Sequence, residues 1–536
     1  MNGELFFVLL LLLLSTTIDG YKILVYSPSI SRSHLISNAR VAEVLAKDGH
    51  DVTLLQLDYG GDYQLKMVEH ARLWTETFPW PNRDAAFNSS DFANSIMSKG
   101  NVLYDYYQML NWQNRLNEAC EHVILTKDLL EKIKNEKFDV YIGEQLDLCG
   151  SGLSKALDIP IHILMHSCPL MQHITSFIGL QMPSNRVPTM AGYGGISDKM
   201  TMTDRFANFV YASFEWAFHS LGAYRTTRIY RRNFGSDFPS ISEIVGSSPL
   251  ILVNVDEFVD MPRPTAHNII NIGGLGLHDT KNTSLTAPFD SEMKKGKKGV
   301  ILVSFGSVVP TTYFPDQLIE NLMNTARNLT DYHFLLKVDK TDKKIQEAAK
   351  GISNLFVNSW LPQPAILQNE RLRLFVTHGG YNSVIESARF GVPLVLVGFF
   401  GDQTSNSATV DRNRWGVDLP KSELLKPSNI LETKIRTVLE NERFREAAKR
   451  TQRLIMSKPT SAEQRLTSWM RFLEENDGKL PELQNEGRHL STVEYYNLDL
   501  IFLAATSTIL VIFVLFKFIR VINRLVRKEE LKLKRS

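Results

Sequence analysis

The chain has 536 residues, 43% of them hydrophobic, and a formal net charge of +2 at pH 7. Single domains usually stop growing well below this length, so we expect two domains. The last twenty residues carry a net charge of +6, which subtracted from +2 leaves −4 for the rest of the chain. That balance lacks the broad basic surface of a nucleic-acid-binding protein, and we exclude that class.

The N-terminus has the pattern of a cleaved signal peptide, residues 1–20. An apolar block, Leu5 to Leu14, is followed by small and polar residues, although Glu4 stands where a basic residue is usual. The block is too short to span a bilayer. We therefore predict that the chain enters the secretory route.

Residues 21–248 are predicted to form a parallel α/β domain. Residues 22–57 have the order strand, helix, strand, with Ser33 as the N-cap of the helix, and the alternation recurs at 138–166. Residues 169–245 lack this alternation and are rich in aromatic side chains. Repeated strand–helix–strand units favour a parallel sheet.

A second α/β domain is predicted over residues 249–476. The alternation restarts with the apolar run 299–310, and a series of helical segments closes the domain. We place the boundary between the domains near 246–255.

The C-terminal region is predicted to cross a membrane once. After a juxtamembrane segment, 477–497, about twenty apolar residues form a span at 498–518, followed by a basic tail, 519–536. The positive-inside rule places this tail in the cytoplasm and the body on the lumenal side. The closing residues KLKRS resemble dilysine-type retrieval signals, which predicts a type I protein of the endoplasmic reticulum.

Three sequons, at Asn88, Asn282 and Asn328, agree with that route and are predicted glycosylation sites. The three cysteines are too few for a disulfide-framed ectodomain. Whether Cys149 and Cys168 form a bond is left open.

The stretch FVTHGGYNSVIES, residues 375–387, predicts an anion site. Strand, glycine turn and helix follow one another, and a helix N-terminus at the carboxyl end of a parallel strand attracts phosphate. Gly379 and Gly380 let the backbone approach an anion, His378 can donate to a phosphate oxygen, and Asn382 and Ser383 begin the helix and can cap it.

The segments around this turn resemble the donor-binding signature of the UDP-glycosyltransferases, glycosyltransferase family 1. The matching pieces are W-x-P-Q from residue 360, T-H-G-G-x-N-S-x-x-E from residue 377, G-V-P, and D-Q-x-x-N from residue 402. The segment TSWMRFL and the start of the span resemble the membrane-bound UDP-glucuronosyltransferases. The resemblance implies a GT-B fold, in which two Rossmann-like domains face a cleft, with the C-terminal transmembrane helix added.

The resemblance also implies a role for each matched residue. Trp360 would stack on the uracil ring, Gln363 would lie by the base or the ribose, and Glu386 would accept from the ribose hydroxyls. The remaining donor contacts would be His378, Gly380, Asn382 and Ser383 with the diphosphate, Asp402 and Gln403 with the sugar hydroxyls, and Ser304, Gly306 and Ser307 beside the donor.

His34, expected in the loop after the first strand, is the candidate base that takes the acceptor proton. A carboxylate usually orients such a histidine, and the resemblance points to Glu144, where relatives have Asp, with Asp147 as a second candidate. The implied chemistry is inverting transfer. No metal and no cofactor are expected, because there is no D-x-D triplet and helix N–H groups would hold the diphosphate of the UDP-sugar co-substrate.

The sequence therefore predicts transfer of glucuronic acid from UDP-glucuronate to small lipophilic acceptors, which the aromatic-rich residues 169–225 would bind. UDP-glucose is the competing donor. The alternative from another class is a non-catalytic membrane protein that binds a sugar nucleotide. The oligomeric state, homo- or hetero-oligomer, is left open.

Overall fold

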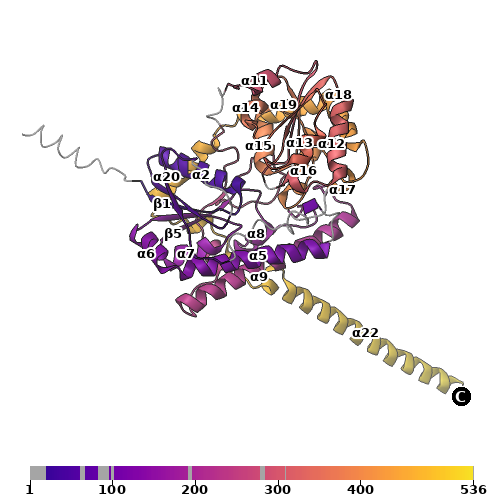
Figure 1. The fold of residues 1–536 in the computed structure, drawn as a ribbon. Helices are drawn as coiled ribbons and strands as arrows, with labels where there is room; N and C mark the ends of the chain where they lie inside the picture. The colour runs from indigo at the N-terminus through magenta and orange to yellow at the C-terminus, as the bar shows by residue number, and fades with distance from the viewer. Residues whose placement is uncertain are drawn as a thin grey trace, which may run out of the picture. The chain divides into compact units, whose positions relative to one another are not determined.

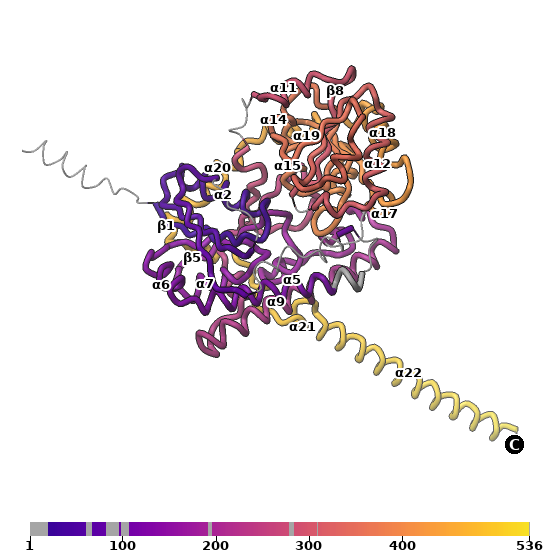
Figure 2. The backbone as a smooth tube through the Cα atoms, in the orientation of Figure 1, coloured from indigo at the N-terminus to yellow at the C-terminus, as the bar shows by residue number. Residues whose placement is uncertain are grey.

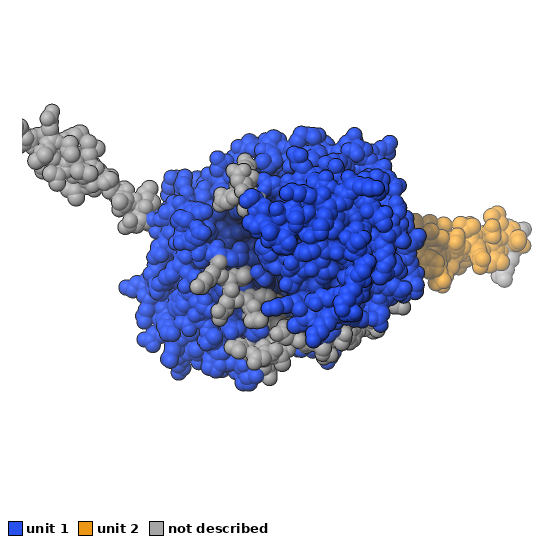
Figure 3. All heavy atoms as spheres, turned by 45° about the horizontal axis from the view of Figure 1, so that its top comes forward, with its two compact units in different colours: residues 1–484 blue, residues 485–536 orange. Residues whose placement is uncertain are grey.

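The computed structural model describes residues 20–60, 67–81, 96–97, 102–190, 196–277, 284–307 and 309–534. Nearly all of the predicted signal peptide and the sequons at Asn88 and Asn282 lie outside these residues. The chain divides into two compact units, residues 1–484 and 485–536, which Figure 3 colours separately. The same view shows a hollow in one face of unit 1.

The first lobe of unit 1 is built on a seven-stranded parallel sheet. Its central strands are apolar and almost wholly buried, as expected when helices cover both faces, whereas the edge strand Arg72–Glu76 is not. In spatial order the strands are β3 (Arg72–Glu76), β2 (Asp51–Leu57), β1 (Lys22–Pro28), β4 (Val140–Glu144), β5 (Ile161–His166), β6 (Ile251–Val253) and β7 (Ile269–Asn271).

Helices from distant parts of the chain surround this sheet (Figure 1). They are α2 (Arg32–Lys47), α5 (Val102–Leu125), α6 (Lys127–Asn135), α7 (Cys149–Ala156), α8 (Gln172–Phe177), α9 (Met202–Phe234), α10 (Ile241–Gly246) and α20 (Ala462–Glu475). Helix α20 lies beside α2 in Figures 1 and 2. It buries Leu466, Met470 and Leu473 in the same core as Ile23 and Ile142 of the sheet.

The second lobe has a six-stranded parallel sheet with its own core. In spatial order its strands are β10 (Leu355–Asn358), β9 (Tyr332–Lys337), β8 (Gly299–Ser304), β11 (Leu372–Thr377), β12 (Leu394–Leu396) and β13 (Gly416–Asp418). Its helices are α11 (Phe289–Glu292), η2 (Thr311–Tyr313), α12 (Asp316–Asn328), α13 (Lys343–Ala348), α14 (Gln363–Gln368), α15 (Tyr381–Phe390), α16 (Asp402–Arg412), α17 (Lys421–Leu424), α18 (Ile430–Glu440) and α19 (Glu442–Met456).

The predicted domain boundary at 248/249 is wrong in two respects. Strands β6 and β7 pair with β5 and extend the first sheet, so the chain passes to the second sheet between Asn271 and Gly299. Helix α20, which the sequence assigned to the second domain, packs on the first. Strands of three residues are too short to show which sheet they join.

Unit 2 contains η4 (Glu486–His489), α21 (Thr492–Tyr495) and α22 (Leu498–Leu533), after the short η3 (Pro481–Leu483) at the end of unit 1. Among the described residues, α22 is the helix that is long and apolar enough to span a membrane, with a mean hydropathy of 2.5 in its most apolar window. The helix continues through the basic tail beyond the predicted span.

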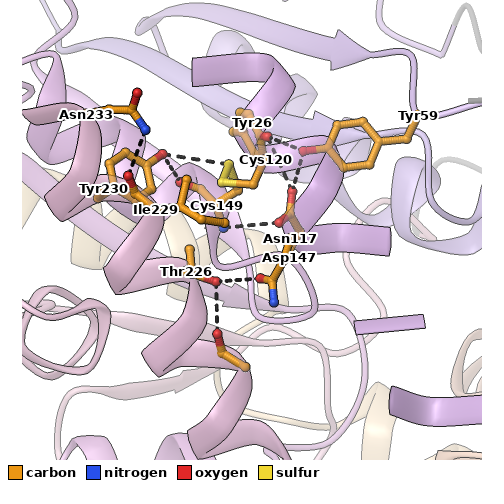
Figure 4. The surroundings of a disulfide bond; sticks show 11 residues. Tyr26, Tyr59, Asn117, Cys120, Asp147, Cys149, Thr226, Ile229, Tyr230 and Asn233 are labelled. Carbon is orange, nitrogen blue, oxygen red and sulfur yellow. Dashed lines mark hydrogen bonds between the residues drawn. A yellow bond between two sulfur atoms is a disulfide. The ribbon is translucent and has the colours of Figure 1, made fainter. Parts of the chain in front are cut away.

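One disulfide joins Cys120 of α5 to Cys149 of α7 in the first lobe, and Cys168 is buried and free. The pairing of Cys149 with Cys168, left open by the sequence, is therefore not formed. Figure 4 shows the bond beside Asp147, which accepts hydrogen bonds from the Cys149 N–H and from the Tyr59 hydroxyl. The bond thus fixes the start of α7, close to the end of β4.

We predict that changing Cys120 and Cys149 together to alanine lowers the free energy of unfolding by about 2–4 kcal/mol, because the unfolded chain regains the freedom of a closed loop. Thermal melting in detergent measures the loss. Changing Cys168 to serine is the control for peptide mapping, which should still find the Cys120–Cys149 linkage. A linkage that includes Cys168 in the native protein would contradict this assignment.

Candidate active site

The turn between β11 and α15 is shaped around the His378 ring. Gly379 has φ +82°, a conformation that favours glycine, and Gly380 is the N-cap of α15. A Cβ on Gly380 would lie 2.5 Å from His378 Nε2, and one on Gly306 would lie 2.6 Å from His378 Cε1. Both glycines are therefore needed for the ring to fit, and they leave the helix N-terminus open to an anion.

His378 is neutral in this setting. Burial lowers its pKa to about 4, and the nearby Lys337 ammonium acts in the same direction. Lys337 itself donates to the Gly306 carbonyl at 2.5 Å, so it helps to hold the turn after β8. A neutral imidazole retains one N–H that can be directed at a phosphate oxygen. The predicted diphosphate residues His378 and Gly380 thus lie together.

The two serines predicted to lie beside the donor, Ser304 at the end of β8 and Ser307 just after it, differ in environment. Ser304 is buried, and its hydroxyl accepts from the Gly306 N–H at 3.5 Å. Ser307 is exposed at the start of the following loop. The Ser304 hydroxyl therefore shapes the turn, whereas the Ser307 side chain is open to a ligand.

A second group of predicted residues meets one turn into α15. Gln363 Nε2 donates to Glu386 Oε2 at 2.8 Å and lies 3.3 Å from the Ser383 hydroxyl. Trp360 is 57% exposed and meets the ring of Phe289 edge-on, with 5.9 Å between ring centroids. An exposed indole fixed at its edge offers a flat face to a base, next to a carboxylate that can accept from hydroxyls.

Asp402 and Gln403 begin α16, and Asn406 fixes this helix to the glycine turn. Asn406 Nδ2 donates to Asp402 Oδ2 at 2.8 Å and to the Gly379 carbonyl at 2.9 Å. The side-chain carbonyl of Gln403 accepts from the Phe399 N–H at 3.0 Å, so only its amide nitrogen remains for a ligand. Sequence reasoning left Asn406 without a role, although it lies within the matched D-Q-x-x-N piece.

His34 and Glu144 form the central pair of the first lobe. His34 Nδ1 lies 3.0 Å from Glu144 Oε2, and because a carboxylate only accepts, Nδ1 carries the proton and Nε2 keeps its lone pair. The expectation that His34 lies in a loop is wrong: Ser31, not Ser33, is the N-cap, and His34 lies in the first turn of α2. The ring is thereby held by a helix rather than by a loop.

Glu144 is held at the end of β4 by several donors. It is 2% exposed and accepts from the backbone N–H groups of Gln145 and Ser167, each at 3.2 Å, and from the Ser167 hydroxyl. Burial alone would raise its pKa, but the charge and hydrogen bond of His34 and the Ser167 hydroxyl outweigh burial and lower it. Glu144 is therefore an ionised partner for His34.

Asp147 occupies a different network, which settles the choice between the two carboxylates. Its Oδ2 accepts hydrogen bonds from the Tyr26 and Tyr59 hydroxyls at 3.3 and 2.9 Å, and burial raises its pKa to about 6. Figure 4 shows these tyrosines pointing at Asp147. Asp147 thus supports the lobe, and Glu144 orients His34.

The N-terminus of α15 also touches the first lobe. Asn382 does not cap its helix: its Nδ2 lies 3.4 Å from the Ser33 carbonyl, and its Oδ1 accepts from Asn254 Nδ2 at 3.1 Å. The Tyr381 hydroxyl accepts from the Asp256 N–H at 2.9 Å. No local pattern in the sequence indicates these contacts, because they join residues more than a hundred positions apart.

Asp402 of the second lobe lies near enough to His34 for the two side chains to influence each other's pKa. Burial raises the pKa of Asp402, and the Asn406 amide and the nearby His34 partly offset this rise. Burial is the largest single influence on the pKa of His34, and it lowers this pKa. The Glu144 carboxylate and then Asp402 act in the opposite direction, and together they raise the pKa above its usual value. The His34 imidazole, its carboxylate partner and the N-terminus of α15 thus lie together between the two lobes.

A group of side chains of the types that bind metals lies on α8 and α9. His173, Glu215 and His219 offer ligand atoms that lie within 4.8 Å of one another. The rings of His173 and His219 are stacked, with centroids 3.8 Å apart and planes 13° from parallel. Because imidazole binds a metal through a lone pair in the ring plane, the two rings as they lie do not converge on one ion.

The comparisons with known proteins place this arrangement in a class. Solved glycosyltransferases share the fold: a glycotransferase of kitacinnamycin matches with a TM-score of 0.59 at 18% identity over 86% of this chain and 100% of its own. A UDP-glucose: anthocyanidin 3-O-glucosyltransferase in complex with UDP matches with a TM-score of 0.57 at 14% identity, covering 86% of this chain and 100% of its own. The fold is the GT-B glycosyltransferase fold.

Sequence similarity then gives the family. The family model described as "UDP-glucoronosyl and UDP-glucosyl transferase" matches residues 21–533. "Putative UDP-glucuronosyltransferase ugt-47" of Caenorhabditis briggsae is 38% identical over 92% of this chain and 91% of its own length. UDP-glucuronosyltransferase 3A1 of Bos taurus is 29% identical over 86% of each chain. The chain belongs to this transferase family and is a UDP-glycosyltransferase.

We predict that Glu144→Gln lowers kcat by roughly 100-fold and moves the acidic limb of the pH–rate profile to lower pH. The base must be neutral to act, so wild-type activity falls as the pH drops through the raised pKa of His34. Without the carboxylate charge, burial lowers that pKa. Asp147→Asn is the matched control and should leave the limb in place; a limb that does not move in Glu144→Gln would contradict the pairing.

Proposed function

We propose that this enzyme transfers glucuronic acid from UDP-glucuronate to hydroxyl groups of small lipophilic acceptors. The observation that carries the proposal is the oriented His34–Glu144 pair, which lies at the same interface as the N-terminus of α15. A base and an anion site at one place are what transfer from a nucleotide sugar requires.

Each end of the donor has a matching group in this proposal. The uracil stacks on Trp360, the ribose hydroxyls donate to Glu386 beside Gln363, and the diphosphate binds at the glycine turn. Asp402, at the start of α16, and the amide nitrogen of Gln403 then meet the sugar hydroxyls. The partial positive charge of the helix terminus stabilises the leaving diphosphate.

The transfer step begins when His34 Nε2 takes the proton of the acceptor hydroxyl. The acceptor oxygen forms a bond to the anomeric carbon from the face opposite UDP, while the bond from that carbon to the phosphate oxygen breaks and its electron pair leaves with UDP. An α-linked donor thereby gives a β-glycoside. Glu144 stabilises the imidazolium that forms.

The identity of the donor sugar rests on similarity. Relatives that match most of the chain are named UDP-glucuronosyltransferases, whereas one of the structural neighbours is named for UDP-glucose. UDP-glucose is therefore the donor to test against UDP-glucuronate.

We also propose that the catalytic unit lies in the lumen of the endoplasmic reticulum. The Cys120–Cys149 disulfide favours an oxidising compartment, and the apolar first part of α22, followed by its basic C-terminal part, fits a single span with a cytoplasmic tail. Asn328 is exposed at the end of α12, where a glycan can be attached.

A donor panel with a mixture of phenols tests this function, with products identified by mass. We expect a mass gain of a glucuronic acid residue, and turnover at least about 100-fold lower in His34→Ala with UDP affinity kept. His267→Ala, which changes an exposed histidine, is the control and should retain wild-type turnover.

Two results would overturn parts of the proposal. A gain of a hexose would replace glucuronate by glucose as the transferred sugar. UDP binding without turnover over all donors and acceptors would make the chain a non-catalytic binder of sugar nucleotides.

A further inference from the structure

Arg40 of α2 forms an ion pair with the carboxylate that we assign to the ribose. Its Nη2 lies 3.5 Å from Glu386 Oε1, and both side chains are largely buried, 20% and 9% exposed. Its aliphatic part packs against Gly276, where a Cβ would lie 3.1 Å from Arg40 Cγ. The guanidinium therefore has a fixed position between the lobes.

The two oxygens of Glu386 are thus oriented by different lobes. Oε1 faces Arg40 of the first lobe, and Oε2 accepts from Gln363 of the second. A carboxylate has about four acceptor positions, so it can keep both partners and still accept from ribose hydroxyls.

Arg40 lies on the face of α2 that meets the second lobe. Ser33 and Ser37 approach Asn382 Nδ2, through the Ser33 carbonyl at 3.4 Å and the Ser37 hydroxyl at 3.5 Å. Positions 33, 37 and 40 are spaced i, i+4 and i+7, which places them along one side of a helix. His34 follows Ser33 directly, so this contact face begins beside the base.

We propose that Arg40 is a positioning residue that couples occupancy of the ribose site to the placement of His34. Ribose hydroxyls that bind Glu386 fix the carboxylate, the carboxylate fixes Arg40, and Arg40 fixes the helix that carries the base. The proposal rests on the proposed function, because it requires that Glu386 receives the ribose. Arg40 would then respond to the bound nucleotide from the first lobe, outside the donor-binding segments of the second lobe.

The test compares the full-length wild type with Arg40→Gln in detergent. The probes are UDP, 2′-deoxy-UDP and 3′-deoxy-UDP, with affinities measured by calorimetry. We expect the wild type to prefer UDP by about tenfold or more over at least one deoxy analogue, since a hydrogen bond to a charged group is lost. In Arg40→Gln this preference should fall to roughly threefold or less, and kcat at saturating donor should fall about tenfold.

Three further variants sharpen the result. Lys47→Gln removes a charge from the same helix, where the exposed Lys47 pairs with Glu43, and should match the wild type. Arg40→Gln combined with Glu386→Gln should prefer UDP over the deoxy analogues no less than Glu386→Gln alone does, because both changes break the same Arg40–Glu386 connection. Arg40→Lys keeps the charge without the planar fork, so its preference for UDP should lie between those of the wild type and Arg40→Gln. If thermal melting shows that Arg40→Gln is unfolded, Arg40→Lys takes its place in the test.

If Arg40→Gln kept the wild-type preference for UDP over the deoxy analogues and the wild-type kcat, the inference would be overturned and the proposed function would stand. A reduced preference for UDP in Arg40→Gln, with an unchanged kcat, would overturn the coupling to His34. A wild-type protein that binds no UDP would instead overturn the proposed function itself.

Discussion

The site depends on a steric constraint: the His378 ring must fit between two backbone turns. Gly306 and Gly380 leave room for it, because a methyl group at either position would overlap the imidazole. The same absence of side chains opens the first turn of α15 to a negatively charged group. Asn406 and Lys337 hold the carbonyls of Gly379 and Gly306, so the surrounding helices and strands maintain the shape of this opening.

The proposed reaction also requires that the first lobe brings a base to this opening. Helix α2 carries His34 in its first turn, and β4 ends at the buried Glu144, so regular elements hold both partners. Asn382 and the pair Arg40–Glu386 join this helix to α15. Preorganisation of this kind is what converts two separate binding surfaces into one reaction site.

Much of this could be predicted from the sequence, because the information was local. The strand, the glycine turn and a helix ending at Gly391, which has φ +65°, are all encoded within twenty residues. The contacts made by Asn382, Tyr381 and Arg40 were not predicted, since nothing in a local pattern records a partner far along the chain. The short strands β6 and β7 and the returning helix α20 were assigned to the wrong lobe for the same reason.

The most direct measurement is an experimental structure of the full-length protein with UDP bound. We expect phosphate oxygens about 3 Å from the backbone amides at the start of α15 and from the His378 ring, with the ribose on Glu386. We also expect His34 Nε2 to face the outer phosphate across a space that one sugar ring fills. A nucleotide bound elsewhere, or a diphosphate that does not contact the turn at Gly379 and Gly380, would contradict these expectations.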